Sequence, residues 1–178
     1  ILNVSFNDAN GGSFRLFLEK SKTQQKKDDV SVRESLDSEK TLGFNGLKPY
    51  EEFAARVLEH QSSFKKVVSK IKDSGKTLMG YGASTKGNVI LQFCGLNHES
   101  ISCIAEINED KLGCVTPGTH IPIISEVEAK ALNPDYFLVL PWHFRDNIIQ
   151  REQNYLRAGG KLIMPLPEIE IVCKPDER

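Results

Sequence analysis

Residues 77–88 read Thr-Leu-Met-Gly-Tyr-Gly-Ala-Ser-Thr-Lys-Gly-Asn, an apolar run followed by a glycine-rich turn. The run at 77–81 predicts a short strand. The largely apolar stretch at 88–94, which ends before Gly95, predicts a helix. A strand, a glycine turn and a helix in this order are typical of a unit in a parallel α/β sheet.

The residues after this unit continue the alternation of strands and helices. Further strands are predicted at 101–107, 120–124, 135–141 and 161–166, and helices at 125–132 and 145–158. Ser125 and Glu128 have the spacing of a capping box at the start of the first of these helices. The strand at 135–141 is apolar throughout, as a strand covered on both faces should be. The sequence therefore predicts a Rossmann-like parallel α/β sheet with helices on both faces.

Three different kinds of sequence precede this sheet. Apolar residues recur at helical spacing from Pro49 to near Gly75 and predict a long amphipathic helix. Residues 19–47 are polar and charged, which fits a linker or a marginal helix. Residues 1–18 predict a β-hairpin, which is marginal in water unless it packs on something else. We expect a hairpin remnant of a preceding domain at 1–18, a linker at 19–47 and the Rossmann-like domain at 48–178.

The composition excludes several classes of protein. The 178 residues carry 23 basic and 24 acidic side chains, a balance that argues against nucleic-acid binding through a basic face. No apolar run approaches the roughly 20 residues of a membrane span, and no signal segment opens the chain. The four cysteines and four histidines show no zinc-ligand spacing. We expect no metal site, reduced thiols and a cytoplasmic location.

The glycine-rich turn is the first candidate site, because parallel sheets bind ligands at the carboxyl ends of their strands. Free N–H groups at the helix start, together with Ser84, Thr85 and a lysine, would form an anion cradle. Glu106 lies 24 positions beyond Gly82, where a dinucleotide fold keeps its ribose-binding acid. The third glycine, Gly87, comes one residue late for that fingerprint. A tight turn with Ser84 or Thr85 as the helix cap is the alternative. The candidate substrate-binding residues here are Tyr81, Gly82, Ala83, Ser84, Thr85, Lys86 and Glu106.

Two further clusters are expected near the same edge. Trp142 and His143 follow the strand at 135–141 and could stack on a base or sugar and donate a hydrogen bond. The alternative is a packing tryptophan beside a partly exposed histidine. His120 lies in the turn at 116–120 and would either face the cleft or have a structural role.

Three of these motifs together resemble a known family. The segments at 80–88, 116–122 and 140–145 are similar to the C-terminal domain of bacterial SAM-dependent C-methyltransferases, which methylate carbons of nucleotide-linked deoxysugars. The similarity runs from about residue 49 to residue 172. Asn-Gly-Gly-Ser at 10–13 also resembles the end of that family's methyltransferase domain.

The resemblance implies an architecture and a chemistry. It implies a zinc-binding region and an S-adenosylmethionine-binding domain before this one, with this domain forming one wall of a nucleotide-sugar cleft. Many relatives carry a histidine, a plausible base, where this chain has Asn10. Asparagine cannot act as a base, so Asp8 or a residue of the preceding domain would take the proton, or the substrate differs. The candidate catalytic residues are Asp8, Asn10 and His143.

Two other functions remain open from the residues alone. The glycine turn and Glu106 favour a non-catalytic nucleotide- or dinucleotide-binding domain, although the late third glycine opposes it. A structural or dimerisation module would leave the candidate residues Tyr81, Lys86, Trp142 and His143 buried or scattered, and not gathered in one place. The resemblance favours the substrate-side domain of a methyltransferase, with S-adenosylmethionine bound mostly outside this chain.

Overall fold

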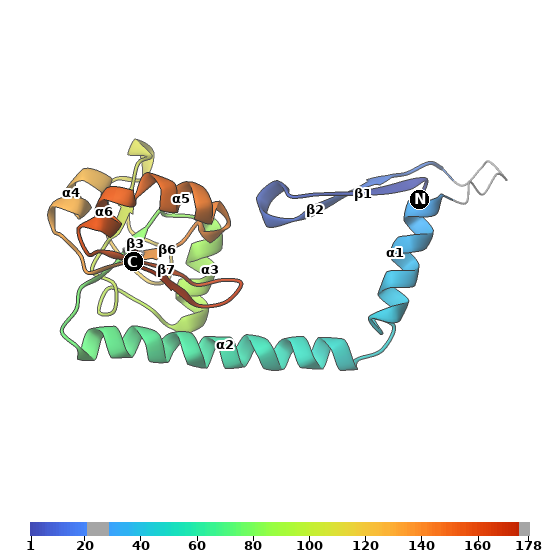
Figure 1. The fold of residues 1–178 in the computed structure, drawn as a ribbon, viewed down its shortest axis with the longest axis horizontal. Coiled ribbons are helices and arrows are strands. Elements are labelled where there is room, and N and C mark those ends of the chain that lie inside the picture. Colours follow the sequence, from blue (N-terminus) through green and yellow to red (C-terminus); the bar gives the residue numbers. More distant parts are fainter. Residues whose placement is uncertain (21–28, 175–178) are drawn as a thin grey trace. The chain divides into compact units, whose positions relative to one another are not determined.

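A computed structural model describes residues 1–20 and 29–174 of the chain (Figure 1). The chain divides into two compact units, Ile1–Leu58 and Glu59–Arg178, which are described separately below. Within the described ranges, no helix is both long enough and apolar enough to cross a membrane. No group of three or more metal-ligating side chains occurs in those ranges.

The first unit begins with an antiparallel hairpin. Strands β1 (Asn3–Asn7) and β2 (Ser13–Phe17) are joined by a short 3₁₀ turn. Helix α1 (Val30–Thr41) begins at its cap Asp29, and the hydroxyl of Ser31 accepts a hydrogen bond from the Val4 N–H. Helix α1 lies within residues 19–47, for which the sequence fitted either a linker or a marginal helix. Residues 21–28 of that segment lie outside the described residues.

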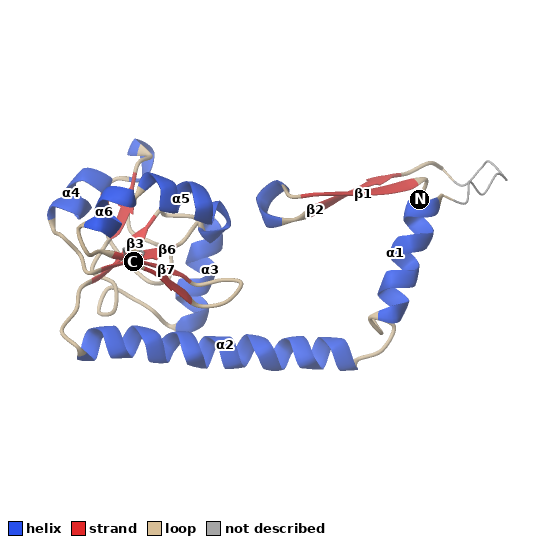
Figure 2. Ribbon diagram, viewed as in Figure 1, coloured by secondary structure: helices blue, strands red, loops and turns tan. Residues whose placement is uncertain are grey.

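The second unit contains a six-stranded sheet in the order β5-β4-β3-β6-β7-β8 (Figure 2). Its strands are β3 (Leu78–Tyr81), β4 (Ile104–Glu106), β5 (Ile123–Ser125), β6 (Tyr136–Val139), β7 (Lys161–Met164) and β8 (Glu170–Val172). Strands β5 to β7 along this order pair in parallel, which confirms the predicted fold class. Strand β8 pairs antiparallel with β7 and was not predicted, since three residues carry too little pattern to identify a strand.

Helices cover both faces of the sheet, as predicted. On one face pack α3 (Thr85–Cys94) and the residues of α2 (Lys48–Asp73) from Glu59 on, through buried side chains such as Phe64 and Leu91. The other face is covered by α4 (Glu126–Ala131), α5 (Arg145–Arg151) and α6 (Gln153–Arg157). Figure 1 shows α4, α5 and α6 together on their side of the sheet.

Two predicted helices differ in how well they match the structure. The capping box of α4 is confirmed, because Ser125 and Glu128 each accept a hydrogen bond from the backbone of the other. The single helix predicted at 145–158 is wrong. It is broken at Glu152, whose φ of −96° and ψ of 20° separate α5 from α6. The side chain at this break is buried, so Glu152 belongs to the interior and not to an exposed helix face.

Candidate functional site

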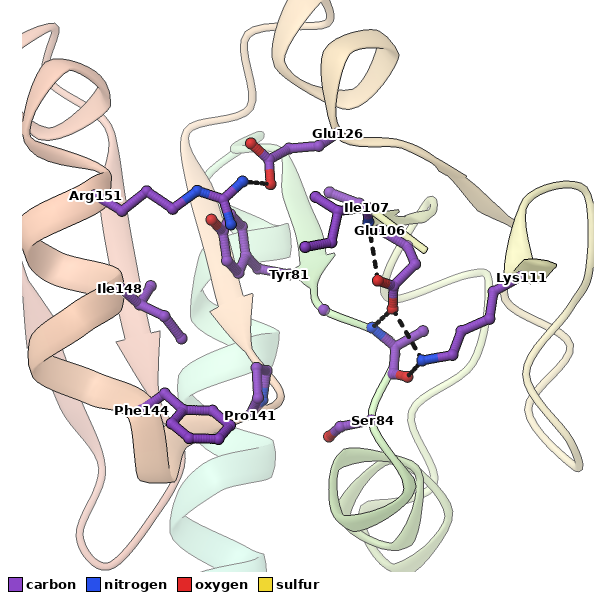
Figure 3. A pocket seen from close by; sticks show the side chains of 13 residues that line it. Tyr81, Ser84, Glu106, Ile107, Lys111, Glu126, Pro141, Phe144, Ile148 and Arg151 are labelled. Atoms are coloured by element: carbon purple, nitrogen blue, oxygen red, sulfur yellow. Dashed lines mark hydrogen bonds and ion pairs between the residues drawn. The ribbon is translucent and has the colours of Figure 1, made fainter. Parts of the chain in front are cut away.

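The carboxyl ends of β3 and β4 border a cavity of about 300 Å³ beside the glycine-rich turn (Figure 3). We call it the charged cavity, because two acids and two bases lie in its wall. It is lined by Tyr81, Gly82, Ala83, Ser84, Ala105, Glu106, Ile107, Lys111, Glu126, Pro141, Phe144, Ile148 and Arg151. The strand order switches sides between the parallel strands β3 and β6, so this is the end of the sheet at which α/β folds bind ligands.

The glycine-rich turn is built by packing and by a helix cap. Gly82 has a φ of +78°, a backbone conformation that favours glycine. The Ser84 hydroxyl caps α3 by accepting a hydrogen bond from the Gly87 N–H at 3.0 Å. A Cβ atom on Gly87 would lie 2.4 Å from the Cβ of Leu140, so only glycine allows this close approach of α3 to the sheet. The late third glycine therefore serves helix–strand packing, and the alternative of a Ser84 cap is what the structure shows.

Glu106 ends β4 and fastens the turn to the neighbouring strand. Its buried carboxylate accepts hydrogen bonds from the N–H groups of Ala83 at 2.8 Å, Ile107 at 2.8 Å and Asn108 at 3.0 Å. The Lys111 ammonium lies 3.3 Å from the same carboxylate and donates to the Ala83 carbonyl at 2.9 Å. Burial raises the pKa of Glu106, but these donors outweigh it and hold the pKa below its ordinary value. Glu106 is thus ionised and already bonded to the chain itself.

A half-buried ionic network, centred on the buried Glu152, lies behind and within the opposite wall. The Tyr81 hydroxyl donates to Glu152 at 2.6 Å, and Lys130 lies 2.7 Å from the same carboxylate. Arg151 pairs with Glu126 and stands over the Tyr81 ring, with 5.8 Å between its Cζ and the ring centroid. Burial and then the Glu152 contact raise the pKa of Tyr81. Figure 3 shows Arg151 and Glu126 meeting above Tyr81, whose side chain is part of the cavity wall.

Sequence reasoning did not find Lys111, Glu126 and Arg151 as members of this site. Each lies in a loop or helix that looks like an ordinary charged surface, and nothing local marks its partner. Lys111 follows Glu106 by five residues across a turn. This short spacing is the one feature of the sequence that could have suggested an ion pair between the two residues. The other two come from separate helices and could be joined only by the tertiary fold.

Lys86, Trp142 and His143 lie outside the walls of the charged cavity. Trp142 is half-buried and packs against the apolar core under α3. The His143 ring lies between the Trp142 and Phe144 rings, and among the described residues its buried Nδ1 has no hydrogen-bond partner. Burial, followed by the nearby Lys86 charge, lowers the pKa of His143. The segment Trp142–Phe144 forms a 3₁₀ turn, of which only Phe144 lines the charged cavity.

The remaining candidates lie elsewhere in the described chain. His120 is exposed, has a φ of +53° and lines neither cavity described in this section. Its backbone N–H donates to the Thr116 carbonyl at 3.0 Å, within a turn closed by the Thr116 and Thr119 hydroxyls. Asp8 and Asn10 belong to the hairpin of the first unit, where Asn10 has a φ of +55°. Their catalytic roles stay predictions.

A second cavity of about 300 Å³ lies on the other face of the sheet. We call it the apolar cavity, because buried aliphatic side chains of the core form part of its wall, although Asp110, Lys111 and other polar residues line the rest. It is lined by Ala83, Ser84, Thr85, Asn88, Leu91, Ile104, Asp110, Lys111, Cys114, Val115, Thr116, Pro117, Ile123 and Leu140. Three residues, Ala83, Ser84 and Lys111, line both cavities. Thr85 thus lies in the apolar cavity, whereas Tyr81, Gly82 and Glu106 lie only in the charged one.

The profile of a family described as the C-methyltransferase C-terminal domain matches residues 8–167. The chain belongs to this family. It is 34% identical over 172 residues to the C-methyltransferase NovU of Streptomyces niveus. That alignment covers 97% of this chain and 41% of NovU, so the chain spans about two fifths of the length of this relative.

Proposed function

We propose that this domain is the substrate-side domain of an S-adenosylmethionine-dependent C-methyltransferase that methylates a carbon of a nucleotide-linked sugar. The observation that carries the proposal is the match to a C-methyltransferase over nearly the whole chain, together with a polar cavity at the ligand-binding edge of the sheet. The domain's part is to bind and orient the sugar nucleotide.

The chemistry of the charged cavity suits a sugar. Each of its cations is paired with a carboxylate, Lys111 with Glu106 and Arg151 with Glu126, so the wall is polar but close to neutral. The Arg151 guanidinium can donate to hydroxyl oxygens, and the Glu126 carboxylate can accept from hydroxyl groups, whereas Glu106 is engaged with the backbone. The exposed Phe144 ring adds an apolar surface for the carbon-bound hydrogens of a sugar ring. Together these groups match a neutral, hydroxyl-bearing ring.

The described residues do not fit the methyl donor. In an α/β nucleotide site, an acid at the end of the second strand binds the ribose hydroxyls. Glu106 has that position, but its carboxylate is already bonded to three backbone N–H groups and Lys111. We therefore propose that S-adenosylmethionine binds in a domain outside residues 1–178. The same occupied carboxylate weighs against a dinucleotide-binding function.

Methylation of a carbon requires that a proton be removed from it. The candidates on this chain are Asp8 and His143, since Asn10 cannot accept a proton at neutral pH. Burial keeps the pKa of His143 low, so its imidazole is neutral and able to accept a proton near pH 7. We propose that one of these two residues, or one in the preceding domain, is the base.

Calorimetric titration of this chain with dTDP, NAD and S-adenosylmethionine in parallel tests the proposal. We expect dTDP alone to bind, and we expect Lys86→Ala to weaken it about threefold, as for an exposed charge contact. The matched control is Lys66→Ala, which removes an exposed lysine from α2. Binding of NAD or S-adenosylmethionine without dTDP would contradict the proposed function. Equal affinity in Lys86→Ala and Lys66→Ala would remove the predicted role of Lys86.

A further inference from the structure

Arg151 and Glu152 are neighbours in the chain, but their side chains lie in different surroundings. The break between α5 and α6 falls at Glu152, which is 2% exposed and does not line the charged cavity. The Arg151 side chain is 45% exposed and does line it, beside Glu126 (Figure 3). Only 3.6 Å separates Arg151 Nε from Glu152 Oε1. The helix break thus places a buried carboxylate next to a cation of the cavity wall.

Arg151 and Glu152 belong to a closed set of ion pairs. Lys130 on α4 lies 2.9 Å from one oxygen of the Glu152 carboxylate and 2.7 Å from the other. The same ammonium lies 2.9 Å from Glu126, whose second carboxylate oxygen pairs with Arg151. The pairs therefore run from Glu152 through Lys130 and Glu126 to Arg151, and back to Glu152. We call these residues the ion-pair network.

The contacts within the ion-pair network are between charged groups. Burial raises the pKa of Glu126, but Lys130 and Arg151 outweigh it and hold the pKa below its ordinary value. Burial lowers the pKa of Lys130, but Glu152 and Glu126 outweigh it and raise the pKa. The Tyr81 hydroxyl adds a hydrogen bond to Glu152 at 2.6 Å, so both oxygens of this carboxylate have donors. Charge-assisted contacts of this kind fix the geometry of the side chains that make them.

Stability alone does not account for such a network. Moving charges out of water costs free energy that their attraction often only balances, and apolar side chains of similar volume can stabilise a fold as well or better. A fixed geometry is what ion pairs add, and Arg151 is the most exposed member of the network. Its Nη1 atom forms no hydrogen bond with the described residues, so its N–H groups are available to a ligand.

We propose that Glu152 is a positioning residue for substrate binding, which holds the Arg151 guanidinium at the wall of the charged cavity through Lys130 and Glu126. This inference rests on the proposed function, because the substrate of that function supplies the oxygen atoms that accept from Arg151. A side chain that is already held loses less conformational freedom on binding than one that is free. Glu152 thereby strengthens binding without touching the ligand.

Calorimetric titration with dTDP-glucose separates a positioning role from a purely structural one. Arg151→Ala should weaken binding about tenfold, since it removes a donor to the ligand. Glu152→Gln leaves Arg151 present but no longer held by the network, and should weaken binding about threefold. In the double variant, Glu152→Gln should add nothing to the loss caused by Arg151→Ala, because its effect passes through Arg151.

The matched control is Glu170→Gln, which also removes a carboxylate that is bonded to an arginine. Glu170 accepts hydrogen bonds from Arg145 at 2.6 and 2.8 Å, but it lies on β8 and lines neither cavity. This variant should bind dTDP-glucose as tightly as the unmodified chain. Circular dichroism checks that each variant is folded at the temperature of the titration. If Glu152→Gln is not folded, Lys130→Met replaces it, since it opens the network at a partly exposed side chain and should also weaken binding about threefold.

The position of Arg151 can be measured without a ligand as well. In an isotope-labelled chain, nuclear magnetic resonance detects the Arg151 Nε–H group, and Arg151→Lys assigns its signal by removing it. Exchange of this proton with water should be about fivefold faster in Glu152→Gln than in the unmodified chain, because the guanidinium moves more freely. It should be unchanged in Glu170→Gln.

The contrary outcomes differ in what they overturn. Equal affinity for dTDP-glucose in Glu152→Gln and Glu170→Gln would overturn the inference and leave the proposed function standing. A loss in the double variant equal to the product of the two single losses would do the same, because Glu152 would then act independently of Arg151. So would weaker binding with unchanged exchange at Arg151. If the unmodified chain does not bind dTDP-glucose, the inference and the proposed function fail together.

Discussion

The two faces of the sheet are built from different chemistry. The buried cluster under α2 and α3 is apolar, with Phe64, Leu91 and Leu138 fully buried in it. The cluster under α4 to α6 instead lies against an ionic network in which Glu152 is 2% exposed and bonded to Tyr81. Both faces stabilise the sheet, but only the second does so with charges that must remain paired.

Each cavity inherits the chemistry of the face that it borders. Leu91 and Ile104 belong to the apolar face and line the apolar cavity. Tyr81 and Ile148 belong to the other face and line the charged cavity, together with Arg151. The difference shows that one end of a sheet can carry two cavities with different linings and no long insertions, because the helices on its two faces contribute different side chains.

The largest effect is expected on the apolar face. Phe64→Ala removes a fully buried ring that holds α2 on the sheet, and should lower the free energy of unfolding by about 3–5 kcal/mol. Urea denaturation followed by circular dichroism measures this. The control is Val127→Ala, whose side chain is 80% exposed and should change stability by less than about 0.5 kcal/mol. Equal losses in the two variants would show that α2 does not stabilise this face.

A smaller effect is expected on the face of the sheet covered by α4 to α6, which we call the charged face. Glu152→Gln keeps the shape but removes the charge that Lys130 and Tyr81 contact, and should cost about 2 kcal/mol. Glu99→Gln, at an exposed position, is the matched control. The same urea titrations compare them. A Glu152→Gln variant as stable as the control would mean that this network adds nothing to the charged face.

The smallest effect is expected at Glu106, and it depends on pH. Because the pKa of Glu106 is lower in the folded chain than its ordinary 4.5, the ionised carboxylate stabilises the fold above that pH and loses this effect as pH falls. Glu106→Gln should cost about 1–2 kcal/mol at pH 7. Its stability should then fall less steeply than that of the unmodified chain between about pH 5 and about pH 3.

Urea midpoints at several pH values measure this difference, with Glu99→Gln again as the control. Parallel stability curves for Glu106→Gln and the unmodified chain would contradict it. Such a result would mean that Lys111 or the glycines, and not Glu106, stabilise the glycine-rich turn.

The sequence predicted the periodic parts of the fold well. The alternation of strands and helices, the long helix from Pro49 and the cap at Ser125 all follow from local spacing, and all are present. Spacing also placed Glu106 at the end of its strand, beside the glycine turn. These features depend on residues within a few positions of one another, which is why a single sequence reveals them.

The parts that were missed depend on contacts between distant segments. Glu152 lies where the pattern predicted the middle of a helix, and its inward position depends on Tyr81, 71 residues earlier. The pairing of Arg151 with Glu126 joins two helices in the same way. A charged residue in a helix ordinarily faces water, so nothing in its neighbours identifies it as buried.

Gly87 shows what a glycine in such a turn can and cannot tell a reader of sequences. A side chain at this position would collide with Leu140 whether or not any ligand is bound. Its presence in this chain therefore carries information about the spacing of a helix and a strand, and none about phosphate. The number of glycines in this loop reports on architecture, whereas a ligand would contact side chains that line the cavities, such as Lys111 and Arg151.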